Sequence, residues 1–397
     1  MSQRRCSKMT IYLDYAATTP IRDEVLESYV QYLKELGNPS SVHSSGQAVR
    51  KALEEARESL AKSIGCHRSE VIFTSGGTES NNSAIKGLYW QRVAEDPKRN
   101  VIITAGTEHH AVIDPIEWLE KHDGAELVWL PVSLAGEIDL AALEKILEDS
   151  SERVALISLM WANNETGVIT DIAAVTTMAS KFSIPVHSDA VAAFGHIPIN
   201  FADSGLATLS VSAHKVGGPI GVGALIVSRS TKLVSLIHGG GQERGLRSGT
   251  MNAPAAKAFA HAAEIAVREL PAESKRLSAL RDQLVAGVQK ISDVAIFTGT
   301  TENRLPNNAH FIFEGCSGDS LLFLLDQQGI SVSTGSACQA GVNGPSHVLI
   351  AMGKTEAQAN ACLRMTLGNK STKEDIDGLL KALPEAIDAA LKAGQHK

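Results

Sequence analysis

The sequence predicts an α/β protein with a large domain, built on a mostly parallel sheet covered by helices, and a smaller α+β domain. Short apolar runs alternate with helical patterns through the first two-thirds of the chain, which is typical of a parallel sheet with helices on both faces. Beyond about residue 260, long helical stretches replace that alternation. The 397 residues, of which 44% are hydrophobic, suffice for two cores.

The expected strands of the large domain are apolar runs bounded by turn residues, over 70–77, 100–106, 125–132, 153–163, 184–190, 207–213 and 223–228. Helical patterns lie between them, for example over 78–94 and 171–182. The smaller domain is expected to contain helices over 252–270 and 274–291, strands in "AIFTG", "AHFIF" and "ISVST", and a helix from about 372. We expect the large domain to span 15–262 and the smaller one to combine 1–14 with 263–397.

Charge and cysteine content exclude several classes of protein. The net charge is −7 and no stripe of lysine or arginine is present, which argues against nucleic acid or a membrane surface as partner. The first ten residues lack the apolar core of a secretory signal, and no apolar run approaches membrane-spanning length. Five widely spaced cysteines without a CxxC pair favour a reducing compartment, so we expect a cytoplasmic location.

Polar residues follow two expected strands at the point where each ends. Asp189 follows "IPVHS", and Ser212, His214 and Lys215 follow the next strand. Ligands of open parallel sheets bind beyond the carboxyl ends of the strands. A lysine that forms a Schiff base and an aspartate that keeps a pyridine nitrogen protonated suit a pyridoxal phosphate site. An ordinary ion pair between Asp189 and Lys215 is the alternative interpretation.

Other strand ends supply weaker signals. "SGGTES" places Gly77 and Thr78 at the start of a helix whose free N–H groups suit a phosphate. A simple glycine turn before a helix would have the same sequence pattern. His109 in "TEHHAV" is suited to stacking on a ring or moving protons. Adjacent histidines lack zinc-ligand spacing, so we expect no metal. Asn163 and Asn164 in "WANNETG" are either ligands or turn formers.

Two arginine-containing segments suit anions. "GGGQERGLRSGT" carries Arg244, Arg247 and Thr250 on a glycine-rich loop that could bind an anion. An ordinary surface loop is the alternative interpretation of this segment. "CLRMTLG" places Arg364 in an apolar setting, where a guanidinium needs a carboxylate partner. That partner is either an internal acidic residue or the α-carboxylate of an amino-acid substrate.

Cys338 lies in "TGSACQAGVNG", where small and polar residues predict a flexible loop that presents the thiol to solvent. A packing cysteine is expected among bulky apolar neighbours instead, and we assign that role to Cys316 and Cys362, which lie near apolar runs. A thiol that must reach a buried site and then transfer a group to another molecule requires such a loop.

Taken together, these segments resemble the aminotransferase class V family of fold-type I pyridoxal phosphate enzymes, and within it the cysteine desulfurases of iron–sulfur assembly. The resemblance covers nearly the whole chain. It rests on "YLDYAATTP", "GNPSSVHSSG", "SGGTESNN", "TEHHAV", "NNETG", "HSDAV", "SAHKVGGPIGVGAL", "GGGQERGLRSGT", "STGSACQAG" and "LRMTLG".

The resemblance implies a role for each candidate residue. Lys215 would form the Schiff base with pyridoxal phosphate, Asp189 would pair with the pyridine nitrogen, and His109 would stack on the ring. Gly77, Thr78, Ser212 and His214 would hold the phosphate, with Thr250 reaching it from the other subunit of a homodimer. Asn164 would contact the ring oxygen or substrate, Arg364 would bind the substrate carboxylate, and Cys338 would be the catalytic cysteine.

One position departs from the family pattern. The family usually has a glutamine three residues after the aspartate, donating to the phenolic oxygen of the cofactor, and this chain has Ala192. Losing one hydrogen bond to a charged oxygen is worth about 1.5–3 kcal/mol. We expect an altered cofactor spectrum rather than an inactive site.

The function implied by the resemblance is cysteine desulfuration. L-cysteine would give L-alanine and a persulfide on Cys338, for transfer to an acceptor protein such as an iron–sulfur scaffold or a client enzyme. A class V aminotransferase or a selenocysteine lyase would use the same Lys215 and Asp189 without needing Cys338. A non-catalytic iron–sulfur scaffold would need neither.

Overall fold

The main sheet places the ends of its parallel strands at one edge. The computed structural model describes residues 10–335 and 344–394. Within them the sheet has seven strands, in the spatial order β2 (Val71–Thr74), β8 (Gly223–Val227), β7 (Thr208–Ser212), β6 (Val186–Asp189), β5 (Val154–Ser158), β3 (Val101–Ala105) and β4 (Glu126–Leu130). Neighbouring strands are parallel along the series β7, β6, β5, β3 and β4. β8 runs antiparallel to both of its neighbours, β2 and β7. The prediction of a mostly parallel sheet is therefore confirmed.

Helices cover both faces of this sheet. α3 (Gly77–Glu95) and α4 (His110–Asp123) pack on one face, where Ile85 and Val112 contact Ile102 and Leu156 in one buried cluster. The other face is covered by α2 (Ser44–Ile64), α5 (Leu140–Ser150), α6 (Ile172–Ser180) and the first half of α8 (Ala253–Ile291). The short helices α1 (Asp23–Tyr32) and α7 (Phe201–Ser204) complete this part of the chain.

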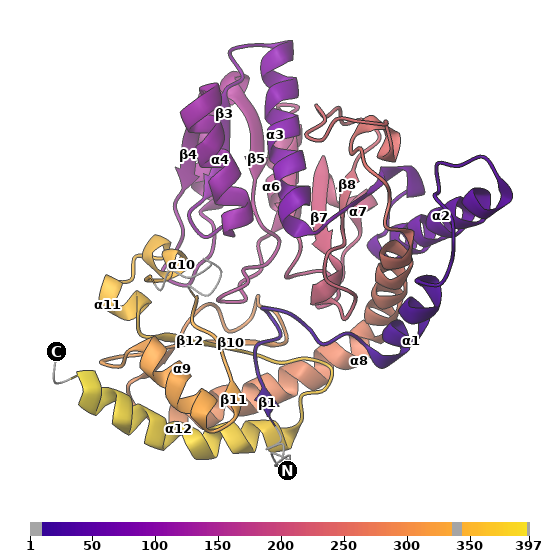
Figure 1. The fold of residues 1–397 in the computed structure, drawn as a ribbon. Coiled ribbons are helices and arrows are strands. Elements are labelled where there is room, and N and C mark those ends of the chain that lie inside the picture. Colours follow the sequence, from indigo (N-terminus) through magenta and orange to yellow (C-terminus); the bar gives the residue numbers. More distant parts are fainter. Residues whose placement is uncertain (1–9, 336–343, 395–397) are drawn as a thin grey trace.

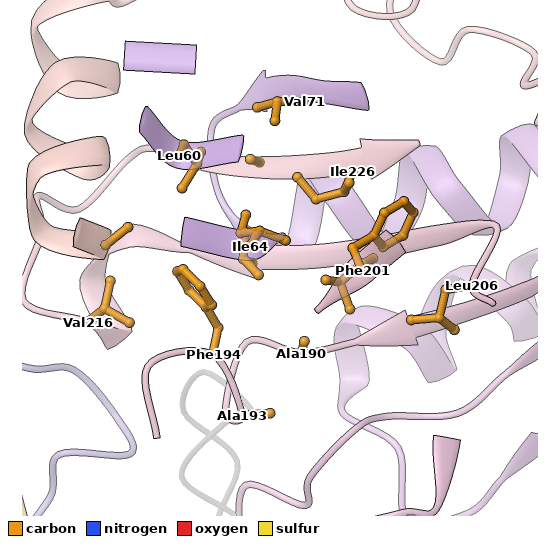
Figure 2. Packing of buried hydrophobic residues seen from close by; sticks show 14 of the residues in the cluster. Leu60, Ile64, Val71, Ala190, Ala193, Phe194, Phe201, Leu206, Val216 and Ile226 are labelled. Atoms are coloured by element: carbon orange, nitrogen blue, oxygen red, sulfur yellow. The ribbon is translucent and has the colours of Figure 1, made fainter. Parts of the chain in front are cut away.

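The core on the α2 face also supports the residues that follow β6. Figure 2 shows Leu60 and Ile64 of α2 in the same buried cluster as Phe194, Ala190 and Ala193. Phe194 is only 1% exposed. Because apolar contacts hold the chain just after Asp189, the end of β6 has a fixed position.

The second part of the structure has its own hydrophobic cluster, built around Leu284, Phe311, Leu363 and Leu383. Its three-stranded antiparallel sheet has the order β12 (Cys362–Thr366), β10 (Asn308–Phe313) and β9 (Ala295–Phe297). A separate parallel pair joins β1 (Ile11–Tyr12) to β11 (Ile330–Ser331), so the start of the chain lies beside its last third (Figure 1). Its helices are α9 (Gly318–Gln327), α10 (His347–Ala351), α11 (Glu356–Ala359) and α12 (Lys373–Gly394).

α8 corrects one sequence prediction. The two helices expected over 252–270 and 274–291 form a single helix of 39 residues that contains Pro271. The proline removes only one backbone donor, and Leu270 and Leu277 on either side of it are both buried. α8 runs from the main sheet to the smaller one (Figure 1). The domain limits at 14/15 and 262/263 remain a prediction.

The cysteines outside the loop of Cys338 differ in burial. Cys316 and Cys362 are buried in apolar clusters, as predicted, and Cys66 is half-buried. Burial raises the pKa of the Cys66 and Cys362 thiols to about 12. Cys6 lies outside the described residues. No helix within the described ranges has the length and apolar character needed to cross a membrane.

Candidate active site

A cavity of about 340 Å³ lies at the edge where β6 and β7 end. Its volume falls within the range of small-molecule sites. Nine of the predicted site residues line it, namely Gly77, Thr78, His109, Asn164, Asp189, Ser212, His214, Lys215 and Arg364. The structure thus brings together residues that are up to 287 positions apart (364 − 77). Thr250 is exposed and is not among the lining residues, and Cys338 lies outside the described residues.

Lys215 follows β7 in a single helical turn, Ala213–Lys215. Its Nζ atom donates to the carbonyl oxygens of Ala16 and Ala17, the latter at 2.9 Å. The segment after β1 therefore contacts the lysine directly. Beside it, burial and then the charge of Lys215 lower the pKa of His214 to about 4, so that imidazole is neutral at pH 7.

Asp189 ends β6 with a buried carboxylate that is 6% exposed. Its Oδ2 accepts a hydrogen bond of 2.6 Å from Nδ2 of Asn81, and its Oδ1 accepts one of 2.8 Å from the backbone N–H of Val191. Both oxygens are thus held by donors. The carboxylate has a fixed orientation at the wall of the cavity.

The closely packed glycine backbone at the start of α3, at Gly76 and Gly77, is called the glycine cradle below. Gly76 precedes the helix with φ +155°, and no side chain caps the first turn. A Cβ atom on Gly77 would lie 2.8 Å from the Val191 side chain, and one on Gly223 would lie 2.7 Å from Cα of Gly76. The backbone is therefore packed so closely that only glycine fits at these two positions. Gly77 and Thr78, at the start of this long helix, line the cavity together with Ser212.

His109 precedes α4 and caps it, because its Nδ1 atom accepts from the backbone N–H of Ala111 at 3.0 Å. Burial lowers the pKa of His109, so the ring is neutral at pH 7 with its proton on Nε2. Next to it, Glu108 is 1% exposed, and burial raises the pKa of that carboxyl well above its usual value. One of its oxygens accepts from the N–H of Met160.

Arg364 on β12 has an internal acidic partner. Its Nη2 atom lies 2.9 Å from Oδ1 of Asp14, and its Nη1 donates to the backbone oxygen of Asn164 at 3.1 Å. The two asparagines of "WANNETG" are separated in role. Asn163 Oδ1 accepts from the N–H groups of Glu165 and Thr166, as a turn former does, whereas Asn164 lines the cavity.

The loop with Arg244 and Arg247 does not line the cavity. Arg247 pairs with Glu79 at 2.8 Å, and Arg244 is exposed. The loop is anchored by Glu243, whose carboxylate accepts from Arg57 at 2.6 Å and from the N–H of Phe73 at 2.8 Å. In the described part of the chain, this loop serves as structure rather than as cavity wall.

Sequence reasoning missed three residues of the cavity wall, Asn81, His196 and Asn307. It also missed Asp14, which does not line the cavity but accepts a hydrogen bond from Arg364. Asp14 and Asn81 lie within motifs that were recognised, but only their partners reveal their roles. His196 and Asn307 each have a ring or amide atom that is buried without a hydrogen-bond partner. Burial lowers the pKa of His196 to about 4.

The cavity fits pyridoxal phosphate by the chemistry of its walls. A lysine amine suits an aldehyde, a fixed carboxylate suits a pyridine nitrogen, and a flat neutral imidazole suits an aromatic face. The glycine cradle at the α3 N-terminus, with Ser212 beside it, suits a phosphate. Ala192 is part of the wall, so the glutamine amide expected by resemblance is replaced there by a methyl group.

Comparisons with known proteins agree with this geometry. The family model for aminotransferase class V matches residues 11–379. An IscS-like cysteine desulfurase of Mycobacterium tuberculosis is 50% identical over 96% of this chain and 97% of the relative. A solved NifS-like protein superposes with a TM-score of 0.88 at 36% identity, covering 96% of this chain and 100% of the other. The structure of SspA in complex with cysteine has a TM-score of 0.76 at 36% identity, over 90% and 98% of the two chains.

Proposed function

The chain belongs to the aminotransferase class V family and is a cysteine desulfurase, and from this premise we propose that it carries sulfur as a persulfide on Cys338. The net reaction converts L-cysteine and the Cys338 thiol into L-alanine and the Cys338 persulfide. All atoms balance, since the sulfur atom moves to Cys338 and the thiol hydrogens are conserved between the products.

The observation that carries the proposal is the meeting of Lys215, Asp189 and Arg364 in one cavity. Lys215 lies in the helical turn after β7 and Asp189 at the end of β6, both in the main sheet, whereas Arg364 lies on β12 of the smaller sheet. Both sheets must therefore be in place to bring the three residues together. An amine, a carboxylate and a guanidinium at one site suit an amino-acid substrate and an aromatic aldehyde cofactor.

Pyridoxal phosphate, when bound, supplies an aldehyde for the substrate amine and an aromatic ring that takes up electrons. The N–H groups at the start of α3, with Ser212 and His214, would hold its phosphate. Asp189 would face the ring nitrogen, and His109 would cover the ring. The homologous family implies this cofactor, and the glycine cradle supports it.

The side chains of this protein then have separable tasks toward L-cysteine. Arg364 binds the α-carboxylate, because its guanidinium reaches the cavity while Asp14 and the Asn164 carbonyl hold its orientation. Lys215 Nζ moves the α-proton of the substrate. His109, neutral at pH 7, is available as a second proton carrier at Nε2.

We place two further properties in the proposal. The enzyme acts as a homodimer, supported by Thr250 lying exposed and outside the cavity of its own chain, and by the exposed Leu36 and Val42. The sulfur is passed to an acceptor protein in the cytosol, supported by five cysteines without a disulfide pattern.

The test is alanine released from L-cysteine by the purified protein with a thiol reductant, measured for the wild type, Cys338→Ala and Lys215→Ala. We expect release from the wild type alone. Cys362→Ala is the matched control, because that cysteine is buried in an apolar cluster, and it should keep its activity if it folds.

The other outcomes identify the alternatives. Equal alanine release by the wild type and Cys338→Ala would indicate a lyase that frees sulfur directly. Transamination products without alanine would indicate an aminotransferase. A biological role that survives Lys215→Ala would indicate a scaffold.

A further inference from the structure

A chain of buried hydrogen bonds runs beneath Asp189, on the sheet face covered by α3. The Thr208 hydroxyl lies 2.9 Å from His187 Nδ1, and His187 Nε2 lies 3.0 Å from Asn81 Oδ1. Asn81 Nδ2 in turn lies 2.6 Å from Asp189 Oδ2. The side chains of Thr208, His187 and Asn81 are completely buried. Of the four residues in this series of hydrogen bonds, only Asn81 and Asp189 line the cavity.

The direction of every bond follows from the charge of Asp189. An ionised carboxylate only accepts, so Asn81 must point its amide nitrogen at Asp189 and its oxygen at His187. That oxygen can only accept, so His187 carries its hydrogen on Nε2. Burial lowers the pKa of His187 to about 3, which leaves one ring hydrogen and makes Nδ1 an acceptor for the Thr208 hydroxyl. Every donor in the chain therefore points toward Asp189.

We propose that His187 and Asn81 are positioning residues that hold the Asp189 carboxylate in place and aimed at the ring nitrogen of the cofactor. The inference rests on the proposed function, because it needs a cofactor with a basic ring nitrogen at Asp189. If Asn81 were not fixed by His187, its amide could rotate and place an acceptor against the carboxylate. The His187 ring prevents this rotation by donating to the Asn81 oxygen.

The same part of the sheet supplies a matched comparison. Thr104 on β3 and Ser158 on β5 are as buried as Thr208, yet their hydroxyls have no hydrogen-bond partner. Unpartnered hydroxyls are thus tolerated in this sheet. Thr104→Val and Thr208→Val are the same chemical change at two completely buried sites, and only the second removes a donor from the chain to Asp189.

The first experiment reads the position of the His187 hydrogen. The measurement is ¹⁵N NMR of the full-length protein without cofactor, with labelled histidines. The His187 signals are those that disappear in His187→Gln. We expect them to show a neutral ring protonated at Nε2 from pH 5 to pH 8. A ring protonated at Nδ1, or a cationic ring in that range, would overturn the proposal.

The second experiment measures the affinity for pyridoxal phosphate by absorbance titration of cofactor-free protein. We expect Thr104→Val to bind like the wild type, Thr208→Val about threefold more weakly and His187→Asn about tenfold more weakly. His187→Gln keeps a donor near the Nε2 position and should bind within about threefold of the wild type. Melting temperatures of all variants identify any that lose affinity through unfolding.

Equal affinities for Thr208→Val and Thr104→Val, or equal losses in His187→Gln and His187→Asn, would show that the chain does not position Asp189. Failure of the wild type to bind pyridoxal phosphate would instead refute the proposed function, and this role with it. The two failures are therefore distinguishable.

Discussion

The guanidinium of Arg364 and the carboxylate of Asp14 form an ion pair of 2.9 Å between residues 350 positions apart in the sequence. The Arg364 side chain is 2% exposed and that of Asp14 is 19% exposed. Under the proposed function, the arginine that binds the substrate carboxylate is already paired with an internal carboxylate. Asp14 and the Asn164 carbonyl use one nitrogen each, and they fix the plane of the guanidinium.

Arg364→Lys is expected to raise KM for L-cysteine at least about tenfold, with a smaller change in kcat. Lysine keeps the charge but cannot make both contacts and bind a carboxylate with two parallel donors. Steady-state kinetics of alanine release provide the measurement. A KM within twofold of the wild type would show that the substrate carboxylate binds elsewhere.

Gly223→Ala is expected to destabilise the protein by about 1–3 kcal/mol and to weaken pyridoxal phosphate binding. The added Cβ would lie 2.7 Å from Cα of Gly76, so the cradle before α3 must shift. Urea denaturation and cofactor titration measure the two effects. Gly124→Ala is the control, because Gly124 has φ +72° but open space around it and lies at the far end of α4, so it should cost stability alone.

Ala192→Gln is expected to shift the absorbance maximum of the bound cofactor and to tighten its binding up to about tenfold. Ala192 lies in the cavity wall, and a glutamine amide there would add a donor for the phenolic oxygen. Spectra and titrations of the variant beside the wild type decide the point. An unchanged spectrum would mean that the amide does not reach the cofactor.

His310→Gln is expected to flatten the pH dependence of stability on the acid side. Burial lowers the pKa of His310 to about 3, whereas in the unfolded chain it is near 6.5. Between those values the unfolded chain binds one more proton than the folded chain, so wild-type stability falls as the pH falls. Between pH 4 and 6, the unfolding free energy of the variant should therefore rise with pH less steeply than that of the wild type, by about 1.4 kcal/mol per pH unit.

Urea denaturation across that pH range measures the slope. Above pH 7 the ring is neutral in both states, so the slopes of wild type and variant should coincide there. Identical slopes at pH 4 to 6 would show that His310 is not buried as a neutral ring.

Much of the site could be predicted because strand ends are visible in the sequence. Asp189 and Lys215 each follow a run of apolar residues, and parallel strands bring such ends to one edge. The orientation of β8 could not be predicted, since an apolar run such as "GALIV" does not indicate whether its strand is parallel or antiparallel to its neighbours. Its reversal brings Gly223, at its amino end, to the cradle.

Pairings between distant segments were equally hidden. Nothing in "YLDYAATTP" indicates that Asp14 meets Arg364. Likewise, nothing near His187 indicates that it contacts Asn81 of α3, 106 positions earlier. The continuity of α8 through Pro271 was missed because proline usually ends a helix, and only the buried residues on both sides of it maintain this one.

The hydrogen bond between the segment after β1 and β12 has a consequence for the order of events during synthesis. The β7–β8 hairpin that carries Lys215 joins neighbouring segments, so it can form while the chain is still growing. Ala16, whose carbonyl accepts from Lys215, is held through its N–H by the hydroxyl of Thr366. This hydrogen bond to the segment over Lys215 therefore cannot form until Thr366 has been synthesised, close to the end of the chain.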